Sequence, residues 1–268
     1  MPLLRSNGVS LHYEMMGSGP PLCLIMGYRL NSAAWPEIFL GSLARRLKVV
    51  IFDNRGTGRS EKPADGYSIE NMARDAVGLL DALAIPRAHV LGYSMGGAIA
   101  QKIAINDKAR VDRLVLFATF CGGIFGTLAD PWVLRRMRDV GGLTPEQVAR
   151  QIFPVTYSPR YLEENLAAAE AQMRREIVYP TPPEIARKQF EGIADYSSFA
   201  QLGEIAAETL VITGTEDILV PPNNSRTLHR RIPNSKLCMI PDLAHRAMWE
   251  EPEETADIIT EFLLAAAS

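Results

Sequence analysis

Short apolar runs recur along most of the chain and alternate with segments of helical periodicity. The first run alternates apolar and polar residues, which predicts a half-exposed strand, whereas the later runs are apolar throughout, as is typical of strands buried on both faces. The predicted strands cover Val9–Met16, Leu22–Met26, Leu47–Phe52, Ala88–Leu91, Leu114–Ala118, Thr209–Thr213 and Lys236–Ile240. The predicted helices between and after them cover Ile69–Leu83, Met95–Ile105 and Glu253–Leu264. This alternation predicts an α/β fold with a mostly parallel central sheet of about eight strands and helices on both faces.

The stretch from residue 122 to residue 199 breaks the alternation, because it contains no strand-like run. It carries helix starts instead: Thr144–Gln147 is a capping box with proline at the first helical position, and Ser158-Pro159 and Thr181–Glu184 are similar. Sheet strands resume after this stretch. We therefore interpret residues 122–199 as a helical cap, or lid, inserted into one core domain formed by residues 1–121 and 200–268.

Composition narrows the class of protein. The chain has 268 residues, of which 47% are hydrophobic and 22% charged, so its core needs neither disulfides nor a metal. Its 28 basic and 31 acidic residues form no basic run, which argues against a nucleic-acid partner. The three cysteines, Cys23, Cys121 and Cys238, lack the spacing of a disulfide framework or zinc site. With no signal-peptide pattern and no membrane-length apolar run, we expect a soluble cytoplasmic protein without a membrane partner; its oligomeric state is unknown.

A glycine-flanked serine follows one of the buried strands. The strand Ala88–Leu91 runs into Gly92-Tyr93-Ser94-Met95-Gly96-Gly97 and then into a helix. A G-x-S-x-G sequence in this setting is typical of a nucleophile elbow, a turn so sharp that the residues on either side of the serine must lack bulk. The turn predicts that Ser94 projects its hydroxyl above the sheet as a nucleophile. The backbone N–H of Met95 begins a helix and is therefore free to hold an oxyanion.

A serine nucleophile needs an adjacent base, and only one of the four histidines is well placed for this role. His245 lies in the loop after the last predicted strand, at the same sheet edge as Ser94. The acid that orients it should come from the loop after Thr209–Thr213, where Asp217 is the first candidate, with Glu216 and the more distant Asp242 as alternatives. The order of these residues along the chain, serine, acid and then histidine, matches that of hydrolases with a nucleophile elbow.

These residues together resemble the α/β-hydrolase superfamily, and in particular its branch of serine esterases, enol-lactonases and related non-haem haloperoxidases. The resemblance includes the elbow, the turn Asp53–Ser60, and the segments Gly214–Asp217 and Ala244-His245. It implies the α/β-hydrolase fold with its inserted lid, a structural role for the Asp53 turn, and the backbone N–H of Tyr28 as the second oxyanion donor. Met26-Gly27 stands where the family often has His-Gly, which a backbone donor does not require. Epoxide hydrolases and haloalkane dehalogenases of this fold have aspartate at the elbow, so Ser94 disfavours both.

The predicted substrate pocket combines the loop beside the oxyanion donor with aromatic residues of the lid. Its candidate residues are Gly27, Arg29, Trp132, Phe153 and Tyr157; Arg29 could bind a substrate carboxylate or simply be exposed. The predicted function is hydrolysis of a small-molecule carboxylic ester or lactone through an acyl-enzyme on Ser94, with no metal or organic cofactor. Two alternatives use the same residues: a carbon–carbon bond hydrolase acting on diketones, and a perhydrolase or acyltransferase. A third is a ligand-binding protein of this fold with little turnover.

Overall fold

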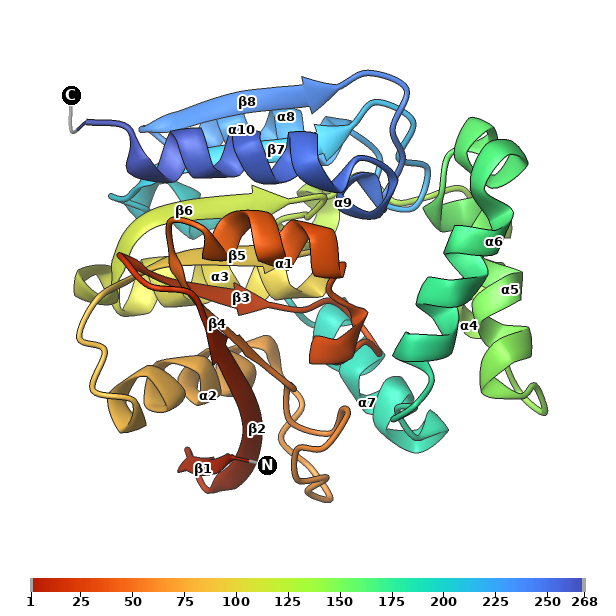
Figure 1. Cartoon of the computed structure of the whole chain (residues 1–268), viewed down its shortest axis with the longest axis horizontal. Coiled ribbons are helices and arrows are strands. Elements are labelled where there is room, and N and C mark those ends of the chain that lie inside the picture. Colours follow the sequence, from red (N-terminus) through yellow and green to blue (C-terminus); the bar gives the residue numbers. More distant parts are fainter. Residues whose placement is uncertain (1, 267–268) are drawn as a thin grey trace.

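A single mixed sheet forms the centre of the computed structural model, which describes residues 2–266 (Figure 1). Its eight strands lie in the order β1-β2-β4-β3-β5-β6-β7-β8. Their bounds are Leu3–Ser6 (β1), Val9–Met16 (β2), Pro21–Ile25 (β3), Lys48–Phe52 (β4), Ala88–Tyr93 (β5), Val111–Phe117 (β6), Glu208–Gly214 (β7) and Ser235–Ile240 (β8). Strand β1 pairs antiparallel with β2, and β2 pairs antiparallel with β4. Every further pairing in the sheet, from β4 to β8, is parallel. The predicted mostly parallel sheet is confirmed.

Strand β1 has no counterpart among the sequence predictions. It pairs with β2 through a two-residue turn at Asn7 and Gly8, whose φ angles of 45° and 82° are those that a tight hairpin requires. Only Ser6 of its four residues is buried. A strand this short and exposed carries too little hydrophobic pattern to be recognised.

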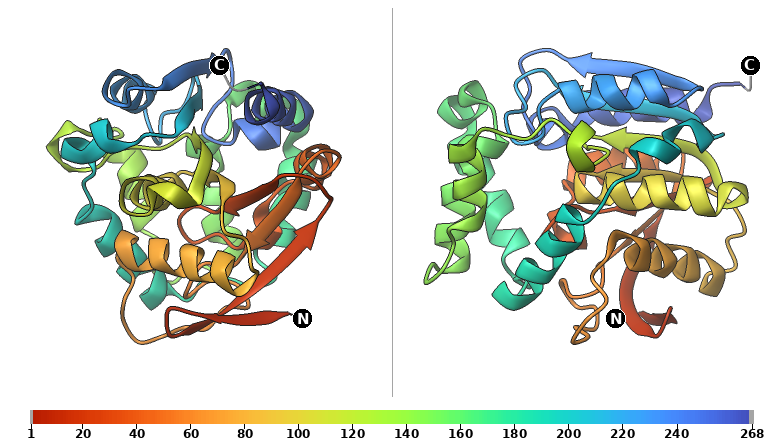
Figure 2. Two further views of the ribbon diagram at one scale, coloured as in Figure 1. Left: turned by 90° about the vertical axis from the view of Figure 1, so that its left-hand side faces the viewer. Right: turned by 180° about the vertical axis from the view of Figure 1, so that it is seen from behind.

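Helices cover both faces of the sheet, as the two further views show (Figure 2). One face carries α1 (Glu37–Ala44) and α10 (Pro252–Leu264), and the other carries α2 (Ile69–Ala82), α3 (Met95–Asn106) and α8 (Asn223–Arg231). The short helix α9 (Ala247–Glu250) precedes α10. Short 3-10 helices occur at Ser32–Ala34, Lys108–Arg110, Gly123–Phe125 and Phe199–Glu204.

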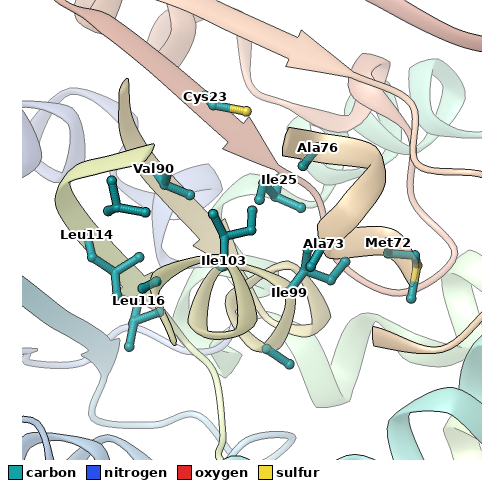
Figure 3. Close-up of a cluster of buried hydrophobic side chains, with 14 of the residues drawn as sticks. Cys23, Ile25, Met72, Ala73, Ala76, Val90, Ile99, Ile103, Leu114 and Leu116 are labelled. Atoms are coloured by element: carbon teal, nitrogen blue, oxygen red, sulfur yellow. The ribbon is translucent and has the colours of Figure 1, made fainter. Parts of the chain in front are cut away.

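The buried strands send alternate side chains into two separate cores. In β3, Cys23 and Ile25 face the core beneath α2 and α3, while Leu22 and Leu24 face the core beneath α1 and α10. Figure 3 shows Ile99 and Ile103 of α3 among the strand residues of the first core. Burial on both faces explains why these strands are apolar throughout.

We call the residues between β6 and β7, 118–207, the inserted segment; it contains four α-helices. They are α4 (Pro131–Arg138), α5 (Pro145–Thr156), α6 (Pro159–Glu176) and α7 (Pro183–Ala194). In Figure 1 they stand beyond the ends toward which β6 and β8 point. The segment contains no strand, only an isolated bridge between Gly122 and Ser197. Its separation as a cap domain stays a prediction, and the predicted core limits at residues 1, 267 and 268 lie outside the described residues.

Two of the three helices predicted in the inserted segment begin where the sequence predicts, and the third begins at a different residue. The capping box at Thr144 is present, and the Ser158 side chain accepts a hydrogen bond from the Tyr161 N–H at the start of α6. Helix α7 begins one residue later than its pattern suggests, because Pro182 is the N-cap residue and Thr181 donates to the carbonyl of Arg29 instead. Among residues 2–266, no helix is long and apolar enough to cross a membrane.

The turn that follows β4 is organised around a buried carboxylate. Asp53 accepts hydrogen bonds from the N–H and hydroxyl of Ser32, at 2.7 and 2.6 Å, and from the N–H of Arg59 at 2.7 Å. Gly58 has a φ of 51°, and a Cβ there would lie 2.2 Å from Asp53 Oδ2. These contacts connect the loops after β3 and β4, which supports the structural role implied for this turn.

Substitution by alanine at two helical glycines should change the free energy of unfolding in opposite directions. A Cβ at Gly96 would lie 2.0 Å from the carbonyl oxygen of Ile25, so Gly96→Ala should lower the free energy of unfolding by about 1–3 kcal/mol. Gly41 in α1 has open space around its Cβ position, so Gly41→Ala should raise it by about 0.5–1 kcal/mol. Denaturant unfolding of both variants measures these changes, and equal effects at the two positions would contradict the packing at Gly96.

Candidate active site

Ser94 stands at a sharp turn between the last residue of β5 and the first residue of α3. Its φ and ψ angles of 54° and −119° are strained for a residue other than glycine. Hydrogen bonds hold the turn: the Ser94 N–H donates to the Phe117 carbonyl at 2.9 Å, and the Ser94 carbonyl accepts from the Thr119 hydroxyl at 2.6 Å. A Cβ at Gly92 would lie 2.2 Å from the carbonyl oxygen of Gly96, so the turn cannot close around larger residues.

Asp217 and His245 are brought together by the loops after β7 and β8. The Nδ1 atom of His245 lies 2.7 Å from Oδ2 of Asp217, and the two residues are only 3% and 2% exposed. The other carboxylate oxygen accepts from the N–H groups of Leu219 and Val220, at 3.0 and 2.7 Å. An ionised carboxylate only accepts hydrogen bonds, so Nδ1 carries the proton and Nε2 is left as the basic nitrogen. The alternative acids Glu216 and Asp242 are both exposed.

A cavity of about 430 Å³ opens beside these residues, and Ser94 and His245 both line it. Most of its wall is apolar and comes from the inserted segment and adjacent loops. Its apolar lining residues are Leu30, Met137, Val140, Leu143, Pro145, Val148, Ala149, Ile152, Ile177, Pro180, Pro182, Pro183 and Leu219. Its charged lining residues are Arg29, Glu176 and Arg246. The cavity therefore offers a mostly apolar space with a few convergent polar groups.

The predicted oxyanion donors are the backbone N–H groups of Met95, which follows Ser94 in the chain, and of Tyr28, which lies in a loop close to it. Met95 is the first residue of α3, and the first N–H groups of a helix have no acceptor within it. The loop after β3 passes close to the serine, because a Cβ at Gly27 would lie 3.2 Å from the Cβ of Ser94. Tyr28, the next residue, lines the cavity. Met95 therefore follows Ser94 in the chain, and Tyr28 follows a residue that packs against Ser94; their roles as oxyanion donors stay predictions.

Only one of the five predicted pocket residues lines the cavity. Arg29 lines the cavity, whereas Gly27, Trp132, Phe153 and Tyr157 lie outside its lining. Trp132 is 43% exposed, and Phe153 and Tyr157 are buried against each other with ring centroids 5.5 Å apart. The sequence predicts aromatic residues of the inserted segment at the cavity, but aliphatic side chains of its helices line the cavity instead.

A buried charge pair, not predicted from the sequence, lies next to His245. Arg246 donates to Glu176 of α6 through both terminal nitrogens, at 2.6 and 2.9 Å, and to the Tyr157 hydroxyl at 3.2 Å. Burial alone would lower the pKa of Arg246, but the adjacent Glu176 carboxylate raises it well above its ordinary value. The pair connects the inserted segment to the loop that carries the histidine. The sequence shows only an arginine after a histidine, which carries no signal of this contact.

A second carboxylate fixes the same loop from the other side. Glu250 accepts from the N–H and hydroxyl of Ser158, at 3.0 and 2.5 Å, and from the N–H of Ala244 at 3.2 Å. Burial raises the pKa of Glu250, although these hydrogen bonds act against the rise. Because Ala244 directly precedes His245 and Ser158 caps α6, Glu250 connects the histidine loop to the start of that helix.

Among residues 2–266, no three histidine, cysteine or acidic side chains are grouped closely enough to hold a metal ion. The site that remains is a buried histidine–aspartate pair beside a strained serine, at the edge where parallel strands end. This arrangement on this fold defines the class of α/β-fold hydrolases.

Comparison with known proteins agrees with this class. Residues 20–252 match the model of the α/β hydrolase fold family, and the chain belongs to that family. It is 29% identical to a putative carbamate hydrolase RutD of Azorhizobium caulinodans, over 98% of this chain and 97% of the relative. It is also 29% identical to a 2-hydroxymuconate semialdehyde hydrolase of Pseudomonas, over 97% of this chain and 92% of the relative. The structure of an enol-lactonase from Burkholderia xenovorans superposes with a TM-score of 0.86 and 25% identity, covering 98% and 99% of the two chains.

The charge pair beside His245 predicts a large effect of a single substitution. Glu176→Ala leaves the Arg246 guanidinium buried without a carboxylate, so the free energy of unfolding should fall by about 3–5 kcal/mol. Denaturant unfolding measures the change.

Two further variants make this test specific. Adding Arg246→Met to Glu176→Ala removes the uncompensated charge and should recover part of the loss. Glu191→Ala breaks the exposed ion pair with Arg187 and should lower the free energy of unfolding by less than about 1 kcal/mol. Similar losses for Glu176→Ala and Glu191→Ala would show that the buried pair has no special role.

Proposed function

We propose that this chain is a serine hydrolase that cleaves a carboxylic ester or lactone through an acyl-enzyme on Ser94. The observation that carries the proposal is that the strained serine and the Asp217-bound histidine line one cavity. The membership of the chain in a hydrolase family supports it, as does the name of the enol-lactonase that it resembles in structure.

In the proposed first half-reaction, Nε2 of His245 removes the hydroxyl proton of Ser94 as Oγ attacks the substrate carbonyl. The Asp217 carboxylate stabilises the imidazolium that forms and keeps the ring in the reactive tautomer. The histidine then gives its proton to the leaving alkoxide as the carbon–oxygen bond breaks. An ester releases an alcohol at this step, whereas the new hydroxyl of an opened lactone stays attached to the acyl group on Ser94.

The second half-reaction repeats these steps with water as the nucleophile. His245 takes a proton from the water molecule that attacks the acyl-enzyme, and it returns that proton to Ser94 Oγ when the acid leaves. In both tetrahedral intermediates, the N–H groups of Met95 and Tyr28 hold the oxyanion. One such donor is typically worth about 3 kcal/mol of the barrier.

The inserted segment would act as the lid and supply substrate selection. Residues of α4 and α5 provide aliphatic side chains to the cavity wall, among them Met137, Val148 and Ile152. A largely apolar cavity of about 430 Å³ suits a small or medium substrate with considerable apolar surface. In this proposal, residues 1–121 and 200–268 form the core domain and residues 122–199 the cap.

The proposed chemistry predicts which substitutions abolish turnover. Ser94→Ala removes the nucleophile and His245→Gln removes the base, so each should lower kcat for an activated ester by about 10⁴-fold or more. The measurement is steady-state hydrolysis of a panel of 4-nitrophenyl esters, lactones, aryl carbamates and diketone ring-cleavage products.

His229→Gln is the matched control, because His229 contacts Ser235 and lies outside the cavity lining. It should retain wild-type turnover. Preference for diketones over every ester would favour the carbon–carbon hydrolase alternative. Ester cleavage only when hydrogen peroxide or an alcohol is present to accept the acyl group would favour the perhydrolase or acyltransferase. Retention of most ester turnover by folded Ser94→Ala would overturn the proposal.

A further inference from the structure

Arg29 occupies a special position in the cavity. It follows Tyr28, the proposed second oxyanion donor, and both residues line the cavity that contains Ser94. A group bound by Arg29 would therefore be held in the same space as the acyl carbonyl during the reaction.

The backbone of Arg29 is fixed in a conformation that arginine rarely adopts. Its φ angle is 65°, in the left-handed region that is unfavourable for a side chain with a Cβ. Two buried side chains hold it there: the N–H of Arg29 donates to Oε1 of Gln189 at 3.2 Å, and its carbonyl accepts from the Thr181 hydroxyl at 2.7 Å. Both partners belong to the inserted segment. Strain that surrounding residues maintain in this way is concentrated at ligand-binding positions.

The charges of the cavity wall do not balance. Two arginines and one glutamate line it, and the glutamate, Glu176, is bound by both terminal nitrogens of Arg246. Arg29 has no carboxylate within ion-pair distance among residues 2–266. Its guanidinium carbon lies 5.9 Å from the ring centroid of Tyr28, and its side chain also interacts with the hydroxyl of that residue, which is neutral. Arg29, a half-buried residue, is therefore a positive charge without an anionic partner at the wall of a mostly apolar space.

We propose that Arg29 binds an anionic group of the substrate, so that the preferred substrate is an ester or lactone with a second, ionised carboxylate. The proposal rests on the proposed hydrolase function and names its substrate class. The planar guanidinium matches a carboxylate with two parallel hydrogen bonds. A carboxylate fits better than a phosphate dianion, because one unpaired cation would leave half of the dianion's charge uncompensated in an apolar wall.

Two substrate pairs test the proposal, and each compares an ionised carboxylate with its neutral methyl ester. The first pair is 4-nitrophenyl hydrogen adipate and 4-nitrophenyl methyl adipate, which place the carboxylate or its methyl ester on the acyl side. The second pair is 4-carboxyphenyl butanoate and its methyl ester, which place it on the leaving group. Each kcat/KM is divided by the uncatalysed rate of the same ester, and the readout is the charged-to-neutral ratio.

The ratio should exceed unity for the wild type in at least one pair. Arg29→Gln should lower that ratio by about 10-fold to 100-fold, because a hydrogen-bonded ion pair is lost. Arg29→Lys keeps the positive charge but loses the planar pair of hydrogen-bond donors, so its ratio should lie between those of the wild type and Arg29→Gln. Arg187→Gln, which removes an exposed arginine of α7 outside the cavity, should leave the ratio unchanged.

Equal ratios for wild type and Arg29→Gln in both pairs would overturn the carboxylate proposal while ester hydrolysis remained established. If folded wild type hydrolysed no ester, the proposed function itself would fail. Binding then still tests Arg29: calorimetry with monomethyl adipate should show affinity for Ser94→Ala and at least 10-fold weaker affinity for Ser94→Ala/Arg29→Gln. Equal affinity of the two variants would reject the role of Arg29 independently of turnover.

Discussion

The close packing of glycines around Ser94 is the constraint on which the rest of the site depends. The turn brings Gly92 against Gly96 and Gly96 against the carbonyl of Ile25, so β5, α3 and β3 meet without side chains between them. Only this approach lets the chain reverse from strand to helix at one residue. The same packing places Ser94 at the cavity wall and begins α3 at the next residue, whose N–H has no acceptor within the helix. Bulk at any of these positions would change both the fold and the chemistry.

The histidine loop is held on two sides by carboxylates that take no part in the proposed chemistry. Glu250 connects the residue before His245 to the start of α6, and Glu176 near the end of α6 binds the residue after it. One helix of the inserted segment therefore connects through both of its ends to the residues on either side of His245, the proposed general base. In the proposed function, this arrangement makes the inserted segment part of the active site and not only its cover. A displacement of α6 would change cavity shape and imidazole position together.

The sequence predicts those features that are encoded locally. An alternating run predicts β2, continuous apolar runs predict β3 to β8, and the G-x-S-x-G pattern predicts the turn at Ser94, because all of these depend on neighbouring residues. Strand β1 was missed because it is short and exposed. The Arg246–Glu176 pair joins residues 70 positions apart, and no local pattern reports such a contact. The three aromatic residues predicted for the pocket lie outside its lining, because which side of an inserted helix faces the cavity depends on its packing against the core; the lining is mostly aliphatic.

The covalent intermediate on Ser94 is the central claim, and it can be observed directly. Wild-type protein is mixed with a slowly deacylated aryl ester, quenched in acid within the first turnovers, and its intact and peptide masses are determined. The account predicts a mass increase equal to one acyl group, located on the peptide that contains Ser94 and absent from Ser94→Ala. Rapid product release with no acyl adduct, or an adduct on another residue, would contradict it.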